Sequence, residues 1–270
     1  MSAHAGTGRA AASVDRVFVG RAAVLVLALG QIVSNVAFEV FSPNDLQSGV
    51  EFSPIVPPGP MFAIWGVIIA ASILWAVLQV RPSVRDSAVR DRLVVPLSLV
   101  YAGFALWLAA ASLGQQSPLT LAVFVLIVGA HAVAWRRISQ GRAEIAGWKP
   151  VDRITLYVSQ GIYAGWTSMA FFVNVATVAQ GTGAPNEGAW GTTWQLLVIA
   201  AAAGVAVVFV VLSGGSAFYA LAASYALVGA GISSSLGGFA VLAVALGVGV
   251  AIVVGSTVVV RALRARRGVG

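Results

Sequence analysis

The chain has 270 residues, of which 59% are hydrophobic and only 9% are charged. A soluble domain carries about 25% charged residues, so this composition excludes a soluble globular protein. The net charge of +7 does not indicate a nucleic-acid partner, because the basic residues flank long apolar segments and do not alternate with aromatic residues on one face. The sequence has no Cys, which excludes disulfides and thiolate metal sites.

Eight apolar segments are long enough to cross a bilayer, which takes about 20 residues each. They predict an all-α membrane protein, a polytopic helical bundle. The predicted spans are residues 17–40, 59–80, 93–113, 118–138, 154–179, 191–212, 216–234 and 237–260. The division between the last two spans rests on the polar break at Gly231–Gly238.

All sixteen Lys and Arg residues fall on one side of a membrane drawn through these spans. They precede or open the first span, lie between the second and third and between the fourth and fifth, and follow the eighth. The opposite loops hold Asp45, Glu51 and Glu187 and no basic residue. The positive-inside rule therefore predicts a multi-pass protein of the inner (plasma) membrane with both termini in the cytoplasm.

We divide the chain into four parts by composition. Residues 1–15 are expected to be a disordered cytoplasmic tail, residues 16–180 a five-helix core, residues 181–262 a three-helix transmembrane extension, and residues 263–270 a basic cytoplasmic tail. A cleaved signal peptide is the alternative for the first span, since Ala22–Leu29 resembles an apolar h-region.

Groups able to perform catalysis are nearly absent from the predicted spans. His131 is the only His in a span, and we expect it to be partly hydrated near the membrane interface. The alternative is that His131 supplies one axial ligand to a haem. A single His cannot form a metal site without nearby carboxylates or thiolates, so the sequence predicts no metal site and no catalytic residue.

The fifth predicted span has two distinct faces. Gly161 and Gly165 form a small-xxx-small pair suited to close helix packing. At 100° per residue the opposite face carries a polar and aromatic stripe, which consists of Ser159, Tyr163, Trp166, Ala170, Asn174 and Thr177. On spacing alone this stripe either lines a cavity or fills the space between helices.

The second span supplies another tryptophan. Prolines precede this helix, where a missing N–H does no harm, and Trp65 then lies too deep for a residue of the interfacial belt. The other tryptophans nearer helix ends or loops are expected to anchor at the interface. They are Trp75, Trp135, Trp148, Trp190 and Trp194.

Two segments carry a resemblance to a known family. The opening of the second span, PPGPMFAIWG, resembles the Pro-Pro…Phe…Trp signature of the TspO/MBR family, the tryptophan-rich sensory or translocator proteins. YAGWTSMAFFVN in the fifth span is similar to the family's Tyr-x-x-Trp-x-Ser-x-Ala-x-x-x-Asn pattern. The resemblance covers about residues 20–180, and the remaining spans are similar to those of the longer bacterial members. In the third span only Trp107 remains of the family's Asn-x-x-x-Trp.

The resemblance implies a five-helix bundle with a pocket that opens toward the first long loop, and a tetrapyrrole, sterol or benzodiazepine-type ligand. We expect a flat hydrophobic ligand, such as a bound porphyrin, to stack on the two motif tryptophans, with the loop 42–58 as a lid. The predicted ligand-binding residues are Trp65, Trp166, Tyr163, Asn174, Ala170, Phe62 and Asn35. The protein would act as a sensor or transporter.

Two alternatives to simple ligand binding stay open, namely light-dependent porphyrin breakdown and a small-solute permease. The expected partners are the lipid bilayer and the small hydrophobic ligand, with no nucleic acid. A homodimer also stays open.

Overall fold

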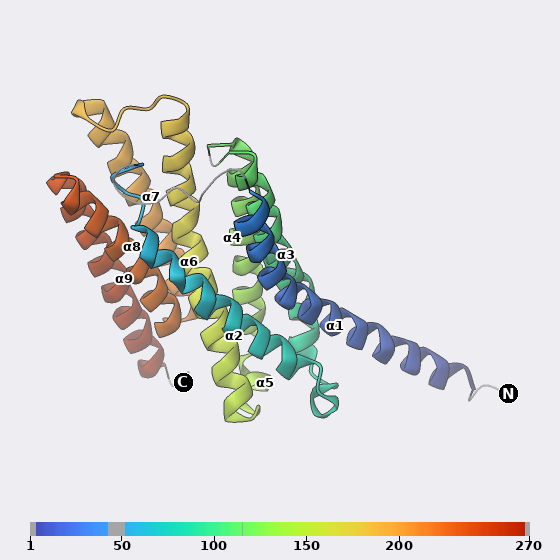
Figure 1. Ribbon diagram of the computed structural model, residues 1–270. Helices are drawn as coiled ribbons and strands as arrows, with labels where there is room; N and C mark the ends of the chain where they lie inside the picture. Colours follow the sequence, from blue (N-terminus) through green and yellow to red (C-terminus); the bar gives the residue numbers. More distant parts are fainter. Residues whose placement is uncertain (1–3, 43–51, 115, 268–270) are drawn as a thin grey trace.

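The computed structural model describes residues 4–42, 52–114 and 116–267, which form helices and no strand (Figure 1). The elements in chain order are α1 (His4–Phe41), the 3-10 helix η1 (Gly59–Ala63), α2 (Ile64–Gln79), η2 (Pro82–Val84), α3 (Ala88–Ser112), α4 (Pro118–Gln140), α5 (Arg142–Ala146), α6 (Pro150–Gly181), α7 (Gly188–Ser213), α8 (Ala217–Leu236) and α9 (Ala240–Arg266). Eight of the described helical segments are long and apolar enough to cross a membrane. The predicted all-α architecture with eight spans is therefore confirmed.

Helix ends follow the local sequence. Pro118 and Pro150 open α4 and α6, where the fixed φ of proline suits the first turn. Ser216 caps α8 through its side chain, which accepts a hydrogen bond from the backbone N–H of Tyr219. The polar break between the last two spans is a true helix boundary, with Gly238 at φ 78° between α8 and α9.

The first predicted tail differs from the structure, whereas the second begins within a helix. α1 begins at His4, so most of the segment expected to be disordered is helical here, and its alanine-rich sequence has a high helix propensity. At the other end, α9 continues through part of the basic tail to Arg266. Residues 1–3 and 268–270 lie outside the described part of the chain.

α6 lies at the centre of the bundle and contacts α2, α4, α7 and α8 (Figure 1). Gly161 and Gly165 of α6 pack closely against α8. A β-carbon added to Gly161 would come within 2.6 Å of the Phe218 Cβ, and one added to Gly165 within 2.5 Å of the Tyr219 carbonyl oxygen. The packing face predicted for this helix therefore has α8 as its partner, and a homodimer would have to use another surface.

One end of the bundle, which we call the basic end, holds the α2–α3 and α4–α6 connections and the end of α9 (lower part of Figure 1). There the buried Arg21 of α1 pairs with Asp91 and also donates to backbone carbonyls of the α2–α3 connection. Asp152 of α6 pairs with Arg81 and Arg90. A charge buried without a partner is destabilising, so separating these helices would be costly. The ion pairs therefore hold α1, α3 and α6 together at that end.

Candidate ligand site

Trp65 and Trp166 lie next to each other between α2 and α6. Their ring centroids are 6.3 Å apart with an angle of 86° between the planes. Trp65 is 7% exposed and Trp166 is 2% exposed. Neither indole N–H has a hydrogen-bond partner in the described part of the chain. An unpaired buried donor is destabilising by about 1–3 kcal/mol, so this pair retains unused capacity to bind an acceptor.

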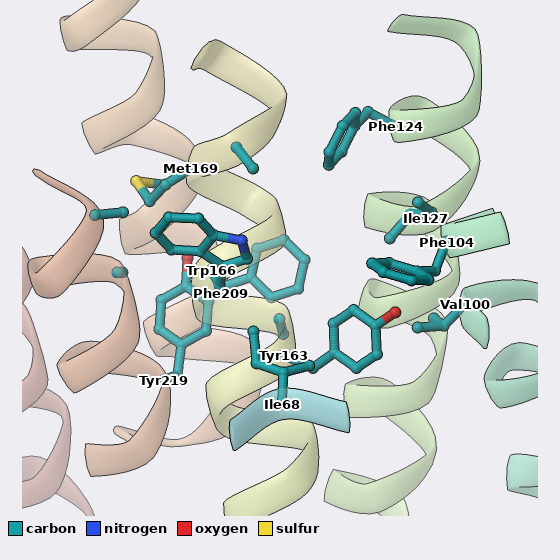
Figure 2. Packing of buried hydrophobic residues seen from close by; sticks show 14 of the residues in the cluster. Ile68, Val100, Phe104, Phe124, Ile127, Tyr163, Trp166, Met169, Phe209 and Tyr219 are labelled. Carbon is teal, nitrogen blue, oxygen red and sulfur yellow. The ribbon is translucent and has the colours of Figure 1, made fainter. Parts of the chain in front are cut away.

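Tyr163, one turn before Trp166 on α6, contacts Trp65 from another side. The two ring centroids are 5.8 Å apart, and Figure 2 shows Tyr163 directed toward Phe104 and Val100 of α3. The Tyr163 hydroxyl donates a hydrogen bond of 2.8 Å to the Gln31 side-chain carbonyl on α1. α1 therefore does contribute a polar group to the cluster.

The α1 residue that binds Tyr163 is Gln31, whereas the α1 residue predicted to contact a ligand is Asn35, and that role stays a prediction. Asn35 is half-buried one turn beyond Gln31, whereas Gln31 is fully buried and binds Tyr163. Both residues lie on the same helix face, since they are four positions apart. Sequence reasoning missed Gln31 because a lone Gln in an apolar span has no motif around it.

His131 is fully buried in α4 and does not lie in a partly hydrated position. Its ring centroid is 5.0 Å from that of Tyr163, and neither ring nitrogen has a hydrogen-bond partner among the described residues. The interfacial expectation was wrong because α4 and α6 pack together at this level. No group of three His, Asp or Glu able to hold a metal occurs in the segments that the structure describes.

Asn174 and Ala170 extend the stripe along α6. The Trp107 indole N–H donates to the Asn174 side-chain oxygen over 3.4 Å, and the Asn174 amide donates to the Ala170 carbonyl over 2.9 Å. Trp107 also stacks on Trp65, with centroids 5.7 Å apart and an angle of 28°. The third-span Trp is thus a full member of the aromatic cluster.

Phe62 and Tyr225 flank Trp166. The Phe62 ring meets Trp166 edge-on with centroids 5.6 Å apart, and the Tyr225 centroid lies 6.2 Å from that of Trp166. Tyr225 belongs to α8, and its hydroxyl donates to the Met61 carbonyl over 3.2 Å. The C-terminal helices therefore supply part of the aromatic cluster, which no pattern in their alanine-rich sequence indicated.

The described part of the predicted lid also lies on α8. The Ser234 hydroxyl donates to the Pro54 carbonyl over 2.7 Å, and a β-carbon on Gly229 would meet the side chains of Pro57 and Met61. Residues 43–51 of this loop, which include Asp45 and Glu51, lie outside the described residues.

The rings of the cluster contact one another directly. A planar ligand that stacks on Trp65 or Trp166 therefore has to replace one of the existing ring contacts. Offset or edge-to-face aromatic pairs contribute about 0.5–1.5 kcal/mol each beyond their buried area, so exchange of one such pair for a larger aromatic surface is energetically feasible.

The interfacial role expected for the remaining tryptophans stays a prediction for Trp190, which is 63% exposed. It is wrong for Trp75, Trp135 and Trp194, which are buried. Trp75, for example, stacks on Trp148 with the Arg90 guanidinium over both rings. The rings that stack on Trp75 and Trp135 are those of Trp148 and Tyr157, which lie outside their own spans, so position along a span could not reveal this burial.

Comparison with known protein families identifies the family of this chain. A family model described as TSPO-like protein matches residues 21–259, a range that includes most of α9 as well as the first five spans. No curated protein and no solved structure matches the chain significantly.

Proposed function

Because the chain belongs to the TSPO-like family, we propose that this multi-pass membrane protein binds a flat, hydrophobic ligand of the tetrapyrrole class against Trp65 and Trp166. The observation that carries the proposal is the pair itself: two buried indoles from α2 and α6, in contact, with both N–H groups unpaired among the described residues. Mostly apolar sites with a few placed polar groups are the usual design for such ligands.

The residues around the pair divide into an aromatic group and a polar group. Phe62, Trp107 and Tyr225 supply further aromatic surface, whereas Asn174 and the Tyr163–Gln31 pair supply hydrogen-bonding groups. A porphyrin combines a wide aromatic plane with carboxylates at its edge. The plane can stack on the face of one indole and meet the edge of the other, because the two rings are nearly perpendicular, and the carboxylates are acceptors for the unpaired indole N–H groups.

The test is quenching of tryptophan fluorescence by protoporphyrin IX, with detergent-purified wild type beside Trp65→Phe and Trp166→Phe. Trp190→Phe is the matched control, because Trp190 is exposed and distant from the cluster in sequence. We expect saturable quenching that weakens in both site variants and persists in the control. Equal, non-saturable quenching in all four proteins would mean that porphyrin only partitions into the micelle, and would overturn the proposal.

The same pair of indoles would lie against a bound porphyrin, which keeps light-dependent breakdown as the second candidate function. Illumination of the complex should then remove the porphyrin absorbance in wild type and less in Trp166→Phe. If the porphyrin absorbance stays constant under light while binding is intact, light-dependent breakdown is excluded and a role as a sensor or transporter remains.

We also propose that the protein resides in the inner membrane of the cell. Its basic end and both of its termini would then lie in the cytoplasm. The support is the charge asymmetry: all sixteen basic residues lie at this end in the sequence-based topology.

A further inference from the structure

A cavity of about 400 Å³ lies at the basic end and is lined by none of the residues of the aromatic cluster described above. It is bounded by α5 and the start of α6, by the α7–α8 turn and by the last turns of α9. Four arginines line it and no Asp or Glu does. These arginines are Arg142, Arg153, Arg261 and Arg264.

Three of the guanidinium groups bind the turn at residues 213–215. Arg142 donates to the Ser213 carbonyl over 3.1 Å, Arg261 to the Gly215 carbonyl over 2.8 Å, and Arg264 to the Gly214 carbonyl over 3.3 Å. The end of α7 carries only about half a negative charge. These carbonyls therefore orient the side chains but leave most of their positive charge uncompensated.

Two of the guanidinium groups lie close to one another over Gly214. A β-carbon on this glycine, which has φ 67°, would collide with both Arg264 Nη1 and Arg142 Nη2. Burial, together with the nearby Arg264, lowers the pKa of Arg142. The ion pairs found in the described part of the chain use Arg21, Arg81 and Arg90, and none of the four cavity arginines. Like charges held this close, without a carboxylate, need a counter-ion.

We propose that this cavity binds a phosphate group, and that in the membrane the phosphate is the headgroup of an acidic phospholipid. Basic pockets between transmembrane helices are typical sites for anionic headgroups. α8 begins at Ala217 in the cavity wall, so the positive end of its dipole adds to the field. Val258, one turn before Arg261 on α9, is exposed and offers an apolar surface for an acyl chain at this end of the helix.

The test measures the melting midpoint of the purified full chain in neutral detergent during titration with phosphatidylglycerol, phosphatidylcholine or inorganic phosphate. The cavity variant is Arg142→Gln/Arg264→Gln. The matched control is Arg266→Gln/Arg267→Gln, which removes the same charge from exposed residues outside the cavity lining. Each Arg near an anionic headgroup is worth about fivefold in affinity, so the cavity variant should lose roughly 25-fold.

Phosphatidylglycerol should raise the midpoint of wild type and control, and the cavity variant should need roughly 25-fold more lipid for the same rise. An equal rise with inorganic phosphate would support the phosphate site but assign it to a soluble anion. No rise in wild type, or equal losses in cavity and control variants, would overturn the proposal.

If the double variant does not fold, Arg153→Gln replaces it, because Arg153 donates to the Ala146 carbonyl and makes no hydrogen bond to the α7–α8 turn. It should lose about fivefold.

Discussion

The ring of Tyr225 in α8 lies against Trp166 in α6, with 6.2 Å between the centroids, so the C-terminal helices contribute a ring to the aromatic cluster. Tyr225→Ala should weaken porphyrin binding roughly twofold to tenfold, the contribution of one aromatic pair. Tyr225→Phe keeps the ring and loses only the hydrogen bond to Met61, so its affinity should stay close to that of wild type. Quenching titrations of both variants check this. An affinity unchanged in Tyr225→Ala would show that α8 does not contact the ligand.

The close approach of α6 and α8 depends on Gly165. Gly165→Leu should reduce the free energy of unfolding by about 1–3 kcal/mol or separate the two helices, because its β-carbon would meet the Tyr219 carbonyl. Gly204→Leu on α7 is the control, since no atom of another helix lies within 4 Å of its added β-carbon. Thermal melting in detergent compares the two. Equal midpoints for both variants would contradict the packing described above.

Asp152 neutralises the buried Arg90 at the basic end, with 3.3 Å between the paired atoms. Asp152→Asn should lower the free energy of unfolding by about 3–5 kcal/mol, because it leaves a buried guanidinium without a carboxylate. Asp86→Asn is the control, as Asp86 is exposed. Denaturant titration measures both variants. A stability loss no larger than that of the control would mean that the cation–π contacts with Trp75 and Trp148 are sufficient for Arg90.

The orientation can be tested cleanly because the chain has no Cys. Ala88→Cys lies at the basic end and Ala189→Cys at the start of α7, and both residues are exposed. A membrane-impermeant maleimide applied to intact spheroplasts should label Ala189→Cys and spare Ala88→Cys until the cells are opened. The reverse pattern would invert the topology and refute the positive-inside assignment for this protein.

Much of the candidate site could be predicted from the α6 stripe. Tyr163, Trp166 and Asn174 all join the aromatic cluster, because a helix period of 3.6 residues already places them on one face. Gln31 and Tyr225 could not be found in this way. Each reaches the cluster from a different helix, and neither lies in a periodic pattern of its own.

The sequence by itself determined the eight spans, their approximate ends and the one-sided distribution of charge. Hydrophobic length, proline and glycine positions and basic clusters are all local properties of the chain. Only the tertiary structure decided which apolar faces meet protein. Lipid tails are as apolar as leucine, so hydropathy cannot distinguish a face that contacts another helix from one that contacts the bilayer. The burial of Trp75 and His131 and the packing of α8 on α6 therefore appeared only when the helices were assembled.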